Sequence, residues 1–119
     1  MQLEDVINEI LLIVYDFGAL PDVPIEGEEF FRKIVSEFAG DKDALLGFIR
    51  RQSPIWFSSF SRPPQWVHEP EWQYNNSRPM IFVGQINITT RNRYIHDDSS
   101  FYLFWDPTTG DMKSIAQVS

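Results

Sequence analysis

The chain has 119 residues, a net charge of −7 and no cysteine; this length indicates one domain, and the composition excludes disulfides and thiolate metal sites. The longest apolar run, residues 10–15, is far shorter than the ~20 residues of a membrane-spanning helix, and the first residues lack the basic segment of a signal peptide. We therefore expect a single domain over residues 1–119 that lies in the cytoplasm and has no membrane partner.

Acidic residues are concentrated at the N-terminal end. The segment through residue 30 contains no Lys or Arg, whereas acids and bases nearly balance after residue 52. An acidic segment repels nucleic acid and attracts basic partners, so we expect no nucleic-acid partner. The alternative is that these side chains only keep the surface hydrated. The acids of the segment are Glu4, Asp5, Glu9, Asp16, Asp22, Glu26, Glu28 and Glu29.

The first half of the chain predicts three helices. Apolar residues recur at helical spacing over residues 3–16, 28–39 and 42–51. Gly18 and Gly40 are expected to end the first two helices, and Asp41 is a suitable N-cap for the third. The third helix should end at Ser53-Pro54, because a proline disfavours helical backbone in the residue before it. Residues 55–60 fit either a short strand or a buried connector.

The second half predicts strands. Residues 80–89 alternate as a strand, and we expect Met80, Phe82, Gly84, Ile86 and Ile88 to form its core face, with an aromatic ring packed on the glycine. Residues 91–100 read as a loop. Strands over 101–105 and 112–118 should form a hairpin around the turn at 106–110. The predicted fold is α+β, with three N-terminal helices (residues 1–52) packed on a small, mainly antiparallel sheet (residues 53–119).

No group of residues predicts catalysis. Two clusters combine histidine with carboxylates, which are His68 with Glu69 and Glu71, and His96 with Asp97 and Asp98. Imidazole and carboxylate can hold Zn²⁺ or Mn²⁺, but adjacent residues of a strand point to opposite faces, and no pair of histidines has helical spacing. We predict no enzyme, no cofactor and no metal; a metal-assisted enzyme that uses His68, Glu69, His96 and Asp97 remains an alternative.

Trp66 and Trp72 lie in a proline-stiffened loop and have two interpretations. As core residues, they would pack across the sheet while the prolines hold the loop. As surface residues, they would form an aromatic anchor for a partner, on a segment that binding would order little further. Both interpretations stay open at the level of sequence.

The passage from Pro64 to Trp72, PQWVHEPEW, followed by the passage from Pro79 to Ile88, PMIFVGQINI, resembles the middle of the YwqG-like domain family. Gln85 and Ile86 stand where that family has Gln-Ile or Gln-Leu. The segment from Phe101 to Gln117 is similar to the family's later hairpin, so the resemblance covers about half of the chain, without the N-terminal helices.

This resemblance implies an immunity protein, because members of the family are often encoded beside bacterial toxins of contact-dependent inhibition or secretion systems. Such a protein binds its cognate toxin and occludes the active site. An acidic surface would suit a basic toxin such as a nuclease. We predict contacts through Asp16, Asp22, Glu26, Glu28 and Glu29, with His68 and Trp72 as anchors. The alternative function is a small ligand-binding or regulatory domain with a pocket beneath the Trp66/Trp72 loop.

Overall fold

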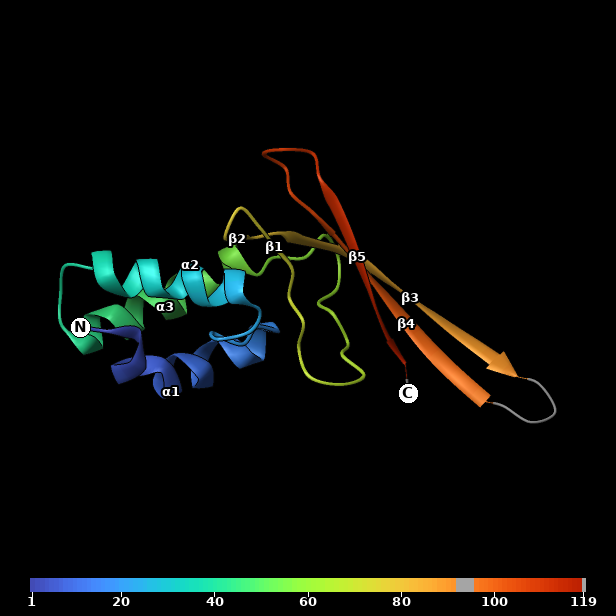
Figure 1. Ribbon diagram of the computed structural model, residues 1–119, viewed down its shortest axis with the longest axis horizontal. Helices are drawn as coiled ribbons and strands as arrows, with labels where there is room; N and C mark the ends of the chain where they lie inside the picture. The colour runs from blue at the N-terminus through green and yellow to red at the C-terminus, as the bar shows by residue number, and fades with distance from the viewer. Residues whose placement is uncertain (92–95, 119) are drawn as a thin grey trace.

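The computed structural model describes residues 1–91 and 96–118, and it has the predicted α+β fold, with helices in the N-terminal half and strands in the C-terminal half (Figure 1). None of the helices in this part of the chain is long and apolar enough to cross a membrane. The elements are α1 (Leu3–Val14), the 3₁₀ turn η1 (Tyr15–Phe17), α2 (Ile25–Glu37), α3 (Lys42–Trp56), β1 (Tyr74–Asn75), β2 (Arg78–Pro79), β3 (Ile81–Arg91), β4 (His96–Trp105) and β5 (Met112–Val118).

The three predicted helices are present, and the end predicted for the third is wrong. Asp41 caps α3 as expected, since its carboxylate accepts a hydrogen bond from Ala44 N at 2.8 Å. However, α3 continues through Pro54 to Trp56. The hydroxyl of Ser53 donates to Ile49 O at 2.6 Å, and the carbonyl of Ser53 accepts from Phe57 N at 2.9 Å. These bonds, with burial of the aromatic residues that follow, offset the cost of proline inside the helix.

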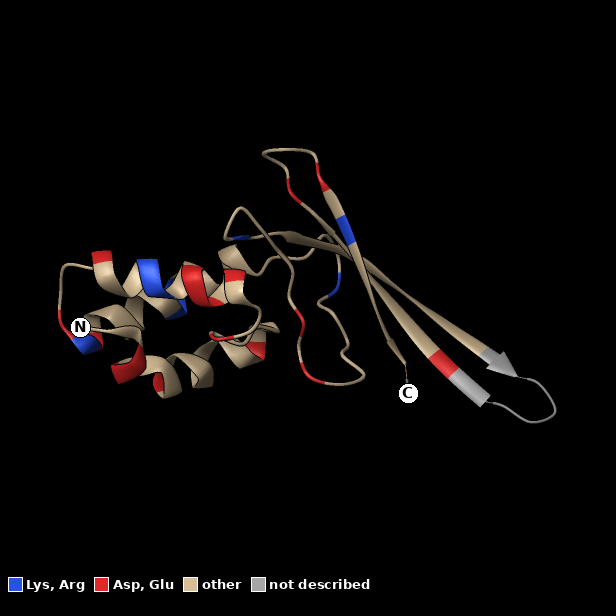
Figure 2. Ribbon diagram, in the orientation of Figure 1, with Lys and Arg blue, Asp and Glu red and all other residues tan. Residues whose placement is uncertain are grey.

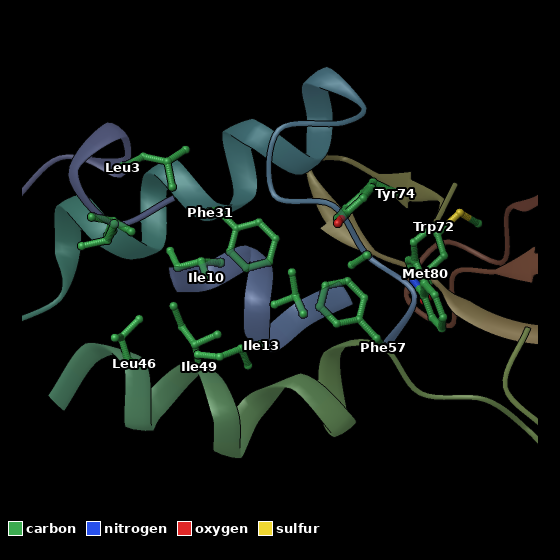
Figure 3. Packing of buried hydrophobic residues seen from close by; sticks show 14 of the residues in the cluster. Leu3, Ile10, Ile13, Phe31, Leu46, Ile49, Phe57, Trp72, Tyr74 and Met80 are labelled. Atoms are coloured by element: carbon green, nitrogen blue, oxygen red, sulfur yellow. The ribbon is translucent and has the colours of Figure 1, made fainter. Parts of the chain in front are cut away.

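The hydrophobic core joins the helices to the first strands. Phe31 of α2 stacks with Phe57, whose ring meets Trp72 edge-on at 5.4 Å between centroids. Tyr74 of β1 packs beside them (Figure 3). Buried side chains from both halves of the chain thus belong to one cluster. Among the helices, α2 packs against both strands of the β1–β2 hairpin, while α1 packs against α2 and α3.

The β1–β2 hairpin was not predicted from the sequence. Asn76 and Ser77 form its two-residue turn with φ angles of 51° and 56°. Two successive positive φ angles define the type I′ turn, whose twist matches that of a hairpin. The sequence does not indicate this turn, because it lacks the glycine typical of a type I′ turn and the two strands are too short to show alternation.

The second sheet is antiparallel in the order β3-β4-β5 and projects from the helical part, which gives a molecule of 59 × 29 × 23 Å (Figure 1). The hairpin and turn predicted between 101 and 118 are confirmed: Trp105 pairs with Met112, and Gly110 N donates to Asp106 O at 2.7 Å with φ 81° at the glycine. The predicted loop over 91–100 is wrong at its ends, because β3 reaches Arg91 and β4 begins at His96.

A β-bulge divides β3 and overturns the predicted core face. The register shifts between Phe82 and Gly84, so that Val83 has no partner on β4. Met80 and Phe82 are buried as expected, but Ile86 and Ile88 are 65% and 48% exposed. No ring packs on Gly84, since nothing lies within 4 Å of the position of a Cβ there. One extra residue reverses the alternation of every side chain beyond it.

Over residues 81–88 of β3 and the residues paired with them, the register defines two faces of this sheet. The inner face consists of Phe82, Phe104, Lys113, Gln85, Tyr102, Ile115, Asn87, Ser100 and Gln117. The outer face consists of Ile81, Trp105, Met112, Gly84, Leu103, Ser114, Ile86, Phe101, Ala116, Ile88, Ser99 and Val118.

Candidate binding surface

The loop over residues 62–72 covers the inner face, and Trp72 is a core residue. Its side chain is 2% exposed, and its indole N–H donates to Met80 O at 2.9 Å. The ring of Trp66 stacks on Tyr102 with centroids 4.6 Å apart. The core interpretation is therefore right for Trp72, and the prediction of Trp72 as a surface anchor is wrong. The alternative function places a ligand pocket beneath the loop. The space under Trp66 and Trp72 is filled by Tyr102, Phe82 and Phe104, and a hollow of about 260 Å³ remains between residues 61–65 and β3.

Two glutamines of the inner face hold this loop by its backbone. Gln117, 4% exposed, accepts hydrogen bonds from Val67 N at 2.9 Å and from His68 N at 3.0 Å. Its amide donates to Glu69 O at 2.9 Å. Gln85 both accepts from the backbone N–H of Gln65, at 2.8 Å, and donates to its carbonyl, at 3.0 Å. The bulge places Gln85 on the inner face, where it can make these bonds.

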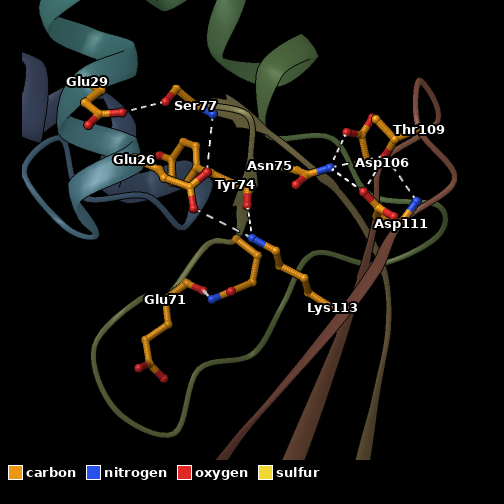
Figure 4. A network of polar contacts seen from close by, with 11 residues as sticks. Glu26, Glu29, Glu71, Tyr74, Asn75, Ser77, Asp106, Thr109, Asp111 and Lys113 are labelled. Atoms are coloured by element: carbon orange, nitrogen blue, oxygen red, sulfur yellow. Dashed lines mark hydrogen bonds and ion pairs between the residues drawn. The ribbon is translucent and has the colours of Figure 1, made fainter.

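Three of the predicted acidic contacts are used inside the molecule. Glu29 accepts a hydrogen bond from the Ser77 hydroxyl at 2.6 Å, and Glu26 accepts from Ser77 N at 3.3 Å and lies 3.7 Å from Lys113 Nζ (Figure 4). Both fasten α2 to the β1–β2 turn. Glu28 forms an ion pair with Arg32 at 2.6 Å. Hydrogen bonds to Glu28 and then to Glu4 raise the pKa of the Arg32 guanidinium.

Further ion pairs neutralise acids of α1. Glu4 pairs with Arg32 at 2.6 Å and Glu9 with Lys42 at 2.5 Å. The Lys42 ammonium lowers the pKa of Glu9, whereas backbone hydrogen bonding, followed by Arg32, lowers that of Glu4. Exposed pairs contribute little stability, but they reduce the charge available to a partner. The red segments of Figure 2 therefore overstate how much of the helical part is free to bind a cation.

Asp16 and Asp22 are exposed and make no ion pair with the residues that the structure describes. Asp16 and His68 line one hollow of about 240 Å³, beside Trp66. Asp22 lies in the turn where Leu20 pairs with Val23. Leu20 and Val23 line a second hollow, of about 430 Å³, together with His68 and Glu69.

The structure thus brings Asp16 into one hollow with His68, and it places Asp22 in the turn between Leu20 and Val23, which line the other hollow. We call the area formed by Asp16, Asp22, His68 and Glu69 the Asp16–His68 surface. His68 is exposed, and its Nε2 atom lies 2.6 Å from Val118 O. This bond connects the histidine to the end of β5, so the imidazole has a defined position beside the two hollows.

The metal hypothesis can be compared with the side chains that the structure describes. Among the described residues, no three His, Asp or Glu side chains are grouped so that they could hold a metal ion. The side chains of His96 and Asp97, which the metal hypothesis requires, lie outside the described part. The buried hydroxyl of Tyr74 has no hydrogen-bond partner there. Burial raises its pKa, so the group stays neutral, and its position against Gly27 is one of packing.

The outer face of the three-stranded sheet is a feature that sequence reasoning missed. Phe101, Met112 and Val118 are 41%, 51% and 52% exposed on it. The apolar residues at 101, 103 and 105 indicate an apolar second face of β4. Nothing in the sequence around β3 indicates the bulge that places Ile86 and Ile88 on the same face.

Comparisons with known proteins give no match: no family model, no curated protein and no solved structure is similar to this chain.

Proposed function

We propose that the protein is a non-enzymatic immunity protein of the bacterial cytoplasm, which binds a cognate basic toxin and occludes its active site. One observation carries this proposal: Asp16 and Asp22 are exposed without an ion pair to the described residues, and Asp16 lines a hollow together with His68. The resemblance of residues 64–88 to YwqG-like domains supplies the class of partner.

Unpaired carboxylates would attract a basic partner and accept its Lys or Arg side chains. Electrostatic complementarity increases association rate and specificity more than it increases raw affinity. The loop beside these acids is held at several backbone atoms by Gln85 and Gln117. Because the loop is already ordered, binding would cost little conformational entropy. The expected mode of action is steric coverage of the toxin by a rigid acidic surface.

The test is coexpression with the product of the adjacent gene, together with measured binding of the two purified proteins. The intact protein should restore growth and bind the toxin. The double variant Asp16→Asn/Asp22→Asn should weaken binding by about tenfold or more, chiefly through slower association. Glu37→Gln/Asp43→Asn is the matched control, because it removes the same charge from exposed sites of α2 and α3.

The outcomes separate the function from the surface. A neighbouring product that is not toxic, or a toxin that kills despite abundant folded protein, would refute the immunity proposal. Equal binding by the two double variants, with growth still restored, would keep the function and remove the Asp16–His68 surface from it.

A further inference from the structure

The outer face of the β3-β4-β5 sheet is an uncovered apolar surface. Ile86, Ile88 and Phe101 are 65%, 48% and 41% exposed. Over residues 81–88 of β3 and the residues paired with them, this face carries no charged side chain. Phe60 extends the surface, since its ring, 59% exposed, meets Trp105 edge-on at 5.8 Å between centroids. Contiguous exposed apolar patches rimmed by polar residues mark sites of association when they exceed a few hundred Å².

We propose that this face is the interface of a two-fold dimer with a second copy of the same chain. An uncharged partner surface is required, because a charged group placed on this face would lose water without gaining an opposite charge. The same face of another copy meets that requirement, and a two-fold axis pairs one patch with itself. Two sheets that pack in this way lie about 10 Å apart with nearly aligned strands.

The distribution of charge favours a second copy over the basic partner proposed above. The net charge of −7 opposes self-association over most of the surface. Figure 2 shows the acidic segments mainly on the helices and on the loops, whereas the middle of the projecting strands is free of charge apart from one basic residue on β5. That residue, Lys113, belongs to the inner face. Pairing through the outer face therefore brings uncharged strand segments, and not the acidic helices, into direct contact.

The size of the face predicts a weak dimer. The outer face is three strands wide and about as long as β5, which has seven residues. Standard strand spacings give such a face a footprint of roughly 300 Å². A standard interface buries about 800 Å² on each partner, so the outer face, even with Phe60 beside it, is well below the standard size. We expect a dissociation constant in the micromolar range or weaker, and thus a monomer–dimer equilibrium. The proposal does not depend on the immunity function.

The test is sedimentation velocity of the full chain from micromolar to near-millimolar concentration. The dimer fraction should rise with concentration. It should also rise with salt, because salt screens the repulsion between two acidic copies while the apolar contact persists. Ile86→Lys and Phe101→Lys should each raise the dissociation constant by about tenfold or more. Ile86→Thr, which keeps a β-branched strand residue, should weaken the dimer less.

Leu12→Lys is the matched control, because Leu12 is 79% exposed on α1, far from this sheet in the chain, and the change is of the same type. It should dimerise like the parent chain, and all variants should keep the far-ultraviolet circular dichroism of the parent. A parent chain that stays monomeric throughout, or a dimer that only Leu12→Lys disrupts, would overturn the proposal. So would a monomeric parent whose toxin binding is abolished by Ile86→Lys, since the face would then belong to the toxin.

Discussion

The indole nitrogen of Trp66 lies directly against the backbone of Gly18: a Cβ atom at residue 18 would come within 2.9 Å of that nitrogen and within 3.3 Å of the Trp72 ring. Gly18 follows η1 with φ 84°, in the left-handed region. The end of the first helical segment and the loop over the sheet therefore meet at a point where only hydrogen fits. This contact connects the two halves of the chain beside the Asp16–His68 surface.

Gly18→Ala should lower the free energy of unfolding by about 2–4 kcal/mol, from left-handed backbone strain together with displacement of the two indole rings. Gly110→Ala is the control, because Gly110 has φ 81° and nothing within 4 Å of a Cβ position. That variant should lose only the backbone contribution, about 1–2 kcal/mol. Urea denaturation followed by tryptophan fluorescence measures both, and equal losses would contradict the packing role of Gly18.

Gln117→Leu should destabilise the protein by about 1–3 kcal/mol, because the part-buried backbone N–H of His68 would lose its acceptor and that of Val67 would keep only the longer bond to Tyr102 Oη, at 3.2 Å. The loop over 62–72 should then open, with red-shifted Trp66 emission and faster proteolytic cleavage in the loop. Gln73→Leu is the control, since the Gln73 amide donates to Glu71 O, two residues away, at 2.8 Å. If the two variants were equally stable and equally resistant to protease, Gln117 would not hold the loop.

Asp106 predicts a loss of stability in acid. Its carboxylate accepts from Asn75 Nδ2 and Thr108 N, each at 2.8 Å, and these bonds, with Asn75 first, lower its pKa below the usual 3.8. Since the pKa is lower in the folded state, the stabilisation is complete above about pH 5 and is lost as pH falls through the folded-state pKa. Asp106→Asn should be less stable at neutral pH and should lose less stability on acidification. Denaturation curves at several pH values measure the free energy of unfolding of both proteins. Equal losses of stability in the parent chain and in Asp106→Asn between neutral and acid pH would refute the prediction.

The helices show how much the sequence could predict and where local rules fail. The apolar spacing located all three, because helical periodicity is a local property of the chain. The extension of α3 through Pro54 could not be predicted, since it depends on the burial of Phe57 against Phe31 and Trp72, residues distant in the chain. The candidate site divides in the same way. Exposed acids were evident, but only the structure shows that Glu26 and Glu29 bond to Ser77 while Asp16 lies beside His68.

The amino-acid sequence by itself determined the α+β order, the cap at Asp41, the turn from Asp106 to Gly110 and the strand that follows it. Only the tertiary structure decided which face of β3 is buried. Alternation predicts two faces but not where an extra residue will interrupt it, because a bulge is stabilised by pairing with another strand and by what covers the sheet. Here Gln85 bonds to the loop on the inner side. Ile86 and Ile88 therefore join the uncovered outer face.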